Sequence, residues 1–236
     1  MEPGAFGAAW TFANWQAALA SNISKAFHWG FEDGALGTDL LHSSAWAMAM
    51  GEGAVGGAKF ANAFALGVQA DSTLPLNTTA TAFAVRGQAS DLYIFVSTLN
   101  ANKSKIPPLS LQLDLEKTFV PAPLADLELH EFRLDARTSL YDVALAELQR
   151  QNATATESLL KWDDGEVYPL SQMATPAGLK ALQANQTAFE AMQAASLLPQ
   201  AFSGKAAAAS GGVRLSLTVD TPCALVVRLR QRNGVQ

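Results

Sequence analysis

Residues 109–115 read Leu-Ser-Leu-Gln-Leu-Asp-Leu, and this strict alternation decides the fold that the sequence predicts. Successive side chains of a β-strand point to opposite faces, so a period of two predicts a strand with one buried face. Residues 213–219 alternate in the same way, and residues 223–229 follow after Asp220-Thr221-Pro222. We expect these last two segments to form a terminal hairpin.

More strands are expected before residue 109. Residues 83–86 and 92–98 are rich in β-branched and aromatic side chains and predict a hairpin around Gly87-Gln88-Ala89-Ser90. Strands of this kind, separated by turns, predict antiparallel sheets that pack face to face.

Three segments depart from simple alternation. The apolar positions change phase between Leu129 and Phe132, and a bulge near His130-Glu131 would explain the change. Residues 206–212 are small and predict a linker. Thr175-Pro176 can begin a helix, because threonine caps well and proline suits the first helical position. Its expected apolar face consists of Leu179, Leu182, Phe189, Met192 and Ala195.

The first 68 residues are rich in alanine, glycine and aromatic residues, and follow the pattern of an α/β unit. We expect a helix at 5–20, a strand at 26–31, a helix at 38–50 that ends at a glycine cluster, and a short helix at 59–66. The expected apolar face of the first helix consists of Phe6, Trp10, Ala13, Ala17 and Ala20.

The composition is that of a globular protein, with 236 residues, 49% hydrophobic and 16% charged. The net charge of −5 gives no electrostatic reason to expect a nucleic-acid partner. Arg228, Arg230 and Arg232 are spaced by two and predict a solvated face of the last strand.

The sequence does not predict a membrane helix, a metal site or a reactive thiol. No apolar run reaches the roughly 18 residues of a membrane helix. No His/Cys cluster has metal-ligand spacing, so we expect neither a metal nor another cofactor. The single Cys223 lies in an alternating apolar run and is interpreted as a small buried hydrophobe.

Five positions match the acceptor pattern for N-glycosylation, which is more than the composition predicts. They suggest a secretory-pathway protein, extracellular or in a lysosome-like lumen, although the first twenty residues do not resemble a signal peptide. Coincidence in a Ser/Thr-rich chain is the alternative. The five asparagines are Asn22, Asn77, Asn102, Asn152 and Asn185.

Residues 26–33 read Ala-Phe-His-Trp-Gly-Phe-Glu-Asp, an aromatic strand that ends in two acids. Residues 132–141 resemble a linker strand and turn, and residues 164–169, Asp-Gly-Glu-Val-Tyr-Pro, precede the predicted helix. In this order the elements resemble the C-terminal portion of glycoside hydrolase family 39, the β-xylosidase and α-L-iduronidase family. Residues 26–33 are similar to its last barrel strand, and the segments after residue 82 are similar to the sandwich beside its barrel.

The resemblance implies an α+β fold, in which the terminal helix-strand-helix of an incomplete (β/α)8 barrel precedes an antiparallel β-sandwich with one inserted helix. Residues 1–70 would be the barrel remnant and residues 71–236 the accessory sandwich. Retaining glycosidases use two carboxylates about 5 Å apart. The resemblance places both before the first helix of this chain, so we expect no catalytic residue here and no hydrolysis by the chain alone.

The same resemblance implies substrate contacts at the end of the strand. Trp29 would stack on a sugar ring, Asp33 and Glu32 would bind its hydroxyl groups, and His28 would lie at the rim. Adjacent strand residues point to opposite faces, so Glu32 and Asp33 do not form an acid/base pair by themselves. The alternatives are a core aromatic for Trp29, a turn cap for the acids and a packed histidine for His28.

Two functions therefore stay open. The first is the C-terminal part of a retaining glycoside hydrolase that acts on a carbohydrate and whose N-terminal barrel segment lies outside this sequence. The second is a non-catalytic β-sandwich for carbohydrate binding or interaction. Under the first, the helices at 5–20 and 38–50 present apolar faces that the rest of the barrel would cover, and the chain alone should aggregate.

Overall fold

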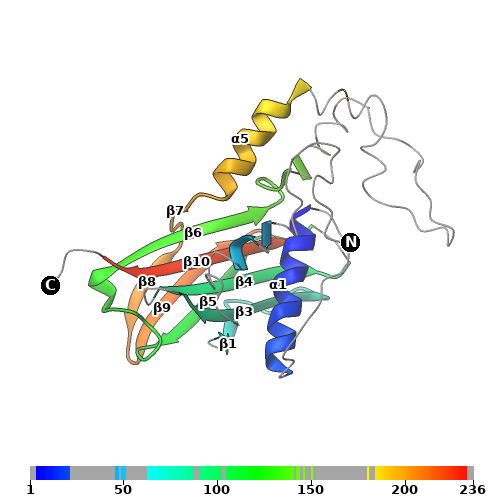
Figure 1. Cartoon of the computed structure of the whole chain (residues 1–236). Helices are drawn as coiled ribbons and strands as arrows, with labels where there is room; N and C mark the ends of the chain where they lie inside the picture. The colour runs from blue at the N-terminus through cyan, green and yellow to red at the C-terminus, as the bar shows by residue number, and fades with distance from the viewer. Residues whose placement is uncertain are drawn as a thin grey trace.

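The computed structural model describes residues 4–21, 46–47, 49–51, 63–87, 91–102, 105–140, 142–143, 146, 150, 180 and 184–232. Within these residues a helix, a six-stranded sheet and a four-stranded sheet lie on one another (Figure 1). All neighbouring strands are antiparallel. The chain therefore has the α+β composition with packed antiparallel sheets that the sequence predicts, while the predicted barrel strand at 26–33 lies outside the described residues.

The larger sheet has the strand order β1-β3-β4-β10-β6-β7. The hairpin expected around residues 87–90 is confirmed, because its two strands pair from Thr78 with Asn100 to Arg86 with Leu92. The strands are β1 (Ala63–Leu66), β3 (Thr78–Arg86), β4 (Leu92–Asn100), β10 (Cys223–Gln231), β6 (Leu127–Asp135) and β7 (Gln200–Ala201).

The smaller sheet has the order β2-β5-β9-β8 and contains the most regular alternation of the sequence. Along β5 the leucines are buried, and the residues between them are exposed or half-buried. The strands are β2 (Val68–Ala70), β5 (Leu109–Glu116), β9 (Gly212–Val219) and β8 (Lys205–Ala209).

An aliphatic core fills the space between the sheets. Leu113 and Leu215 from the smaller sheet are 0% exposed, as are Ile94 and Leu225 from the larger one. Burying one such side chain contributes about 1.5–3 kcal/mol, so this core is the main stabilising feature of the sandwich.

A second, aromatic core covers the other face of the larger sheet. Helix α1 (Gly4–Ala20) contributes Phe12, whose ring lies 5.1 Å from that of Phe95 in an edge-to-face contact. Phe95 also stacks on Phe83 at 4.8 Å. A short helical piece contributes Trp46, whose Nε1 donates to the Ser196 carbonyl at 3.1 Å. The central part of the larger sheet is therefore buried on both faces.

Helix α1 forms where the sequence predicts a helix, but its predicted apolar face is not the side that packs on the sheet. The helix packs on the sheet through Ala5, Ala8, Ala9 and Phe12, all at most 1% exposed. Trp10, which belongs to the predicted apolar face, is 45% exposed. Apolar residues surround most of the helix, so the sequence pattern does not distinguish the sheet-facing side.

The terminal hairpin predicted from residues 213–229 is wrong. β9 pairs with β5 and β8 in the smaller sheet, whereas β10 pairs with β4 and β6 in the larger one. The two strands face each other across the aliphatic core, and each buries alternate residues in it. Alternation shows that a strand has a buried face, but it does not identify the sheet to which the strand belongs.

The bulge predicted near His130-Glu131 is also absent from β6, which pairs with β10 without interruption from Leu127 to Asp135. The change of phase arises because both faces of the strand are covered. Leu129 contacts the aliphatic core, and Phe132 belongs to the aromatic core.

Two further segments differ from their predictions. Residues 63–66, predicted as part of a helix, form β1, which pairs with β3. Residues 206–209, predicted as a linker, belong to β8, which forms a hairpin with β9. Alanine-rich segments have little intrinsic preference for strands, so pairing with a neighbouring strand decides both conformations.

The helix predicted from Thr175 is described only in its second half, as α5 (Gln186–Ser196), because residues 175–179 lie outside the described part. Phe189 is buried, as predicted, but Ala195 is exposed. A one-turn 3-10 helix, η3 (Leu124–Asp126), precedes β6.

Candidate functional site

The predicted sugar-binding residues His28, Trp29, Glu32 and Asp33 lie outside the described residues, so their roles stay predictions. The same holds for the glycosylation candidates Asn22 and Asn152. We therefore sought a site among the described residues.

Two of the remaining glycosylation candidates lie side by side. Asn77 is exposed in a turn with φ of 60°, and its carbonyl accepts a hydrogen bond from Ala101 N at 2.8 Å. Asn102 is exposed in the neighbouring turn. Asn100 joins the turns, since its side chain donates to the Leu76 carbonyl and accepts from Asn102 N. The third candidate, Asn185, precedes α5 and is half-buried.

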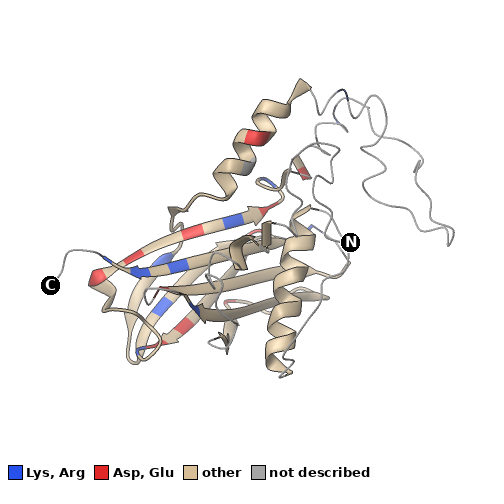
Figure 2. Cartoon of the chain, viewed as in Figure 1, with Lys and Arg blue, Asp and Glu red and all other residues tan. Residues whose placement is uncertain are grey.

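Charged residues gather on the part of β6 and β10 that lies away from α1 (Figure 2). Arg228 lies on the face of the larger sheet that carries the aromatic core, because it follows Val226 by two residues. We call this group the polar patch. It consists of Asp91, Tyr93, Glu128, His130, Arg228 and Arg230.

Within the polar patch, Arg230 forms a closed ion pair. Its Nη2 and Nε donate to Asp91 Oδ2 at 2.7 and 3.0 Å, and Asp91 is 2% exposed. This hydrogen bonding to Asp91 raises the pKa of Arg230. Arg230 is therefore occupied by an internal carboxylate.

Arg228 has different surroundings. Its Nη2 lies 3.3 Å from His130 Nδ1, and its guanidinium lies 6.0 Å from the centre of the Phe132 ring. Its Nε is inaccessible to solvent and has no hydrogen-bond partner among the described residues. His130 Nε2 in turn lies 3.4 Å from Glu128 Oε1. Arg228 is thus held by a histidine and an aromatic ring rather than by a carboxylate.

The sequence prediction for the three arginines is partly wrong. Arg228 and Arg230 share a face, as their spacing predicts, but both are half-buried rather than solvated. Arg232 is exposed and follows the end of β10. No local signal identifies Asp91 as a partner, because it lies 139 residues from Arg230 along the chain.

A half-buried carboxylate, that of Asp142, anchors the start of α1. Asp142 Oδ2 accepts a hydrogen bond from Ala5 N at 2.7 Å, near the positive end of the helix dipole. A side chain at Gly4 would come within 2.7 Å of the same carboxylate, and Gly4 has φ of +76°, so the position requires glycine. Burial raises the pKa of Asp142.

A second polar network closes one edge of the sandwich. Glu131 is 5% exposed, and its Oε2 accepts hydrogen bonds from Ser203 N and Ser203 Oγ at 3.0 and 2.8 Å. Its Oε1 accepts from Arg133 Nε at 3.1 Å. These groups satisfy one another and join β6 to the segment before β8, so this network has a structural role.

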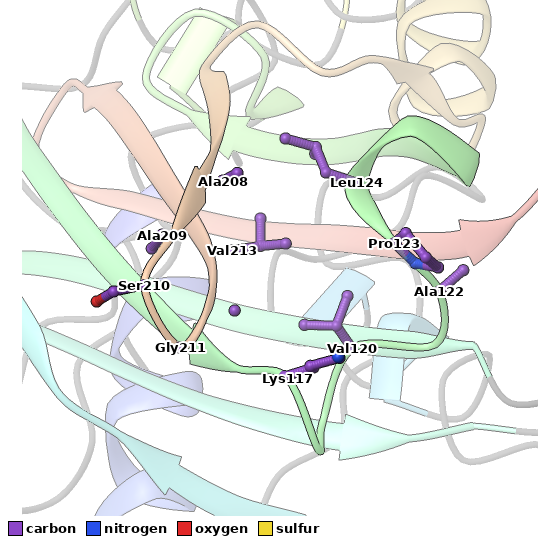
Figure 3. A pocket seen from close by; sticks show the side chains of 11 residues that line it. Lys117, Val120, Ala122, Pro123, Leu124, Ala208, Ala209, Ser210, Gly211 and Val213 are labelled. Atoms are coloured by element: carbon purple, nitrogen blue, oxygen red, sulfur yellow. The ribbon is translucent and has the colours of Figure 1, made fainter.

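A shallow groove of about 390 Å³ lies between the β5–β6 connection and the β8–β9 hairpin (Figure 3). Its lining is mainly apolar, with Val120, Leu124 and Val213 around it and Lys117 at one end. Gly212 allows the hairpin to approach β5, because a Cβ there would lie 1.9 Å from the Leu115 carbonyl oxygen. The lining contains no acid or histidine that could act as a base.

Neither a metal site nor a membrane helix emerges from the described residues. No three or more His, Cys, Asp or Glu side chains group there in a way that could hold an ion. None of the helices in this part of the chain is long and apolar enough to cross a membrane.

No family model, no curated protein and no solved structure matches this chain.

Proposed function

We propose that this chain is the C-terminal part of a retaining glycoside hydrolase, with the described sandwich as its accessory domain. The observation that supports the proposal best is the position of α1, which covers the larger sheet with one side only. Only Thr11, Asn14 and Gln16 interrupt its apolar and glycine residues, so its outward side is apolar as well. A helix that is apolar all round is typical of packing on both sides.

In the proposed enzyme, α1 lies between the sandwich and the barrel. Residues 26–33 then contribute one wall of the sugar site, with Trp29 as a stacking surface, Asp33 and Glu32 as hydroxyl contacts and His28 at the rim. The catalytic carboxylate pair belongs to the rest of the barrel. The chain by itself therefore binds no sugar ring between two carboxylates and hydrolyses nothing.

Hydrolysis provides the direct test. We expect no turnover when the purified chain is incubated with a panel of p-nitrophenyl glycosides, because the carboxylate pair is not in this sequence. Turnover that disappears in Glu32→Gln or Asp33→Asn would contradict the proposal, since these residues would then be catalytic by themselves.

The exposed side of α1 provides a second test. If this side normally packs against a barrel, the isolated chain should bind a fluorescent dye that reports apolar surface, and Trp10→Ser should reduce the signal. The matched control is Leu198→Ser, because Leu198 is 58% exposed but follows α5 instead of lying on α1. A monodisperse monomer with little dye binding would argue against the barrel interface.

The predicted secretory origin belongs to the same proposal and has its own readout. Asn77 and Asn102 are exposed in turns, as a glycosylated asparagine must be. Expression through a eukaryotic secretory pathway should give a mass that falls on treatment with a glycosidase for N-linked glycans. Asn77→Gln and Asn102→Gln should each remove one glycan, and an unmodified secreted chain would contradict this part.

A non-catalytic β-sandwich for carbohydrate binding is the second candidate. It is favoured by the polar patch, where Tyr93 is half-buried and lies opposite Arg228 in the register of the larger sheet. Slower migration of the chain in gels that contain a polysaccharide, abolished by Tyr93→Ala, would support this candidate.

A further inference from the structure

Arg228 and Arg230 lie two residues apart on one face of β10, yet only one of them has a carboxylate partner. Arg230 donates three hydrogen bonds to Asp91. Arg228 forms no ion pair with any residue in the described part of the chain, and its contacts are His130 and Phe132. Its positive charge is therefore uncompensated at close range.

The guanidinium of Arg228 is already held in one orientation. The contact with His130 Nδ1 positions Nη2, the Phe132 ring lies beside the guanidinium, and Nε is enclosed. A flexible arginine loses side-chain entropy when it binds an anion, whereas a preorganised one loses little. Arg228 is therefore better prepared for binding than an ordinary surface arginine.

His130 supports this arrangement as an acceptor. An arginine can only donate, so the contact with Nδ1 assigns the lone pair to that nitrogen and the proton to Nε2, which faces Glu128. In this tautomer the imidazole is neutral. It orients Arg228 without neutralising its charge.

Tyr93 stands on the other side of Arg228. In the register of the sheet, Arg228 lies opposite Tyr93 on β4 and opposite His130 on β6. Such cross-strand neighbours have Cβ atoms about 4.5–5.5 Å apart, so their side chains reach one another. The Tyr93 hydroxyl can donate a hydrogen bond to a ligand that meets the guanidinium.

We propose that the row Tyr93–Arg228–His130 is a binding site for a single carboxylate group of a small organic acid. The two oxygens of a carboxylate match the planar donors of a guanidinium, which is the commonest strong pairing of arginine. Asp91 is neutralised by Arg230, but Glu128 lies beside the row and repels a second negative charge. The site therefore selects a monoanion over a phosphate or sulfate dianion.

Nuclear magnetic resonance of the arginine Nε–H groups tests the proposal on the whole chain. Titration with sodium acetate at constant ionic strength should shift the Arg228 signal until it saturates, while the signals of Arg230 and Arg214 stay in place. Acetamide, which has the same shape without charge, should cause no shift. Inorganic sulfate should bind more weakly than acetate.

Variants separate a specific site from general ion effects. Variants at Arg228 lack the Nε–H group itself, so their acetate binding is read from the backbone amide signals of β10. Arg228→Gln should abolish the saturable shift of these signals, and Arg228→Lys should weaken binding about tenfold because the planar fork is lost. Arg232→Gln is the matched control, since Arg232 is exposed beyond the end of β10, and should leave binding unchanged. Equal losses in Arg228→Gln and Arg232→Gln would overturn the proposal.

Tyr93→Phe keeps the proposal testable if Arg228→Gln does not fold. It removes one hydroxyl and should weaken acetate binding several-fold with an unchanged amide spectrum elsewhere. Absence of a saturable shift in the unaltered protein would also overturn the proposal. None of these outcomes depends on the glycosidase proposal, which is read from turnover and dye binding.

Discussion

The two faces of the six-stranded sheet bury different kinds of side chain. The inner face meets the second sheet through leucine, valine and isoleucine, whereas the outer face meets α1 through Phe83, Phe95 and Phe132. The inner core joins two surfaces that both alternate with a period of two. The outer core joins a sheet to a helix, and large rings fill the wider and less regular space between them.

The comparison shows why the central strands lack alternation. β4 and β10 are buried on nearly every residue because both faces are covered, whereas β5 and β9 bury every second residue because one of their faces is open. The aliphatic core can form without α1, but the aromatic core cannot. We therefore expect the outer layer to be the one that opens first.

Phe95→Ala should cause the largest loss of stability, and it should act on the outer face of the larger sheet. Phe95 is 0% exposed and its ring contacts Phe12 on α1 as well as Phe83 on β3. Loss of the ring should lower the free energy of unfolding by about 3–5 kcal/mol. Urea denaturation followed by tryptophan fluorescence measures the change.

Hydrogen exchange localises the effect of this substitution. In Phe95→Ala, amides of α1 should exchange faster by a larger factor than those of β5. Leu113→Ala, the matched substitution in the aliphatic core, should accelerate exchange in both sheets. Equal acceleration of α1 and β5 in the two variants would show that the layers open as one unit.

Asp142→Asn should have a smaller effect that depends on pH. Burial raises the pKa of Asp142 above its ordinary 3.8, so the folded protein retains a proton that the unfolded chain releases. The contribution of Asp142 to the free energy of unfolding is fully present below pH 3.8. It is lost as the pH rises through the pKa that Asp142 has in the folded state. Asp142→Asn keeps a side-chain oxygen that can accept the hydrogen bond from Ala5 N. Because asparagine does not titrate, the free energy of unfolding of this variant should not fall as the pH rises through this range.

Asp114→Asn is a control, because Asp114 should change the free energy of unfolding with pH in the direction opposite to that of Asp142. The hydrogen bond from Arg214 lowers the pKa of Asp114, so its contribution is present above 3.8 and is lost as the pH falls. The Asp114 side chain is exposed, so we expect its contribution to the free energy of unfolding to change only slightly with pH. A contribution of Asp142 to the free energy of unfolding that changes with pH in the same direction as that of Asp114 would contradict a pKa raised by burial.

The parts of the fold that were predictable are those with a local cause. β5 and β9 follow from their alternating leucines and valines, and α1 follows from its alanine-rich sequence. The partner of each element is not a local property. For this reason β9 and β10 looked like a hairpin, and the alanines of β8 looked like a linker.

The site illustrates the same limit. The spacing of Arg228 and Arg230 predicts that they share a strand face, and it does so correctly. Their different roles depend on Asp91 and His130, which the topology brings from two other segments of the chain. The predicted sugar contacts at His28, Trp29, Glu32 and Asp33 stay predictions.

Cys223 reports on the opening of the aliphatic core without any substitution. It belongs to the aliphatic core at 1% exposure, and burial raises the pKa of its thiol to about 12. A free thiol ionises substantially near pH 8.5, so only the folded state should withhold the thiolate from a thiol reagent such as dithionitrobenzoate. We expect negligible colour from the native protein and one equivalent from the chain in guanidinium, since the sequence has 1 cysteine. Rapid reaction of the native protein would mean that the inner core opens readily, which would reverse the order of opening inferred from the two faces.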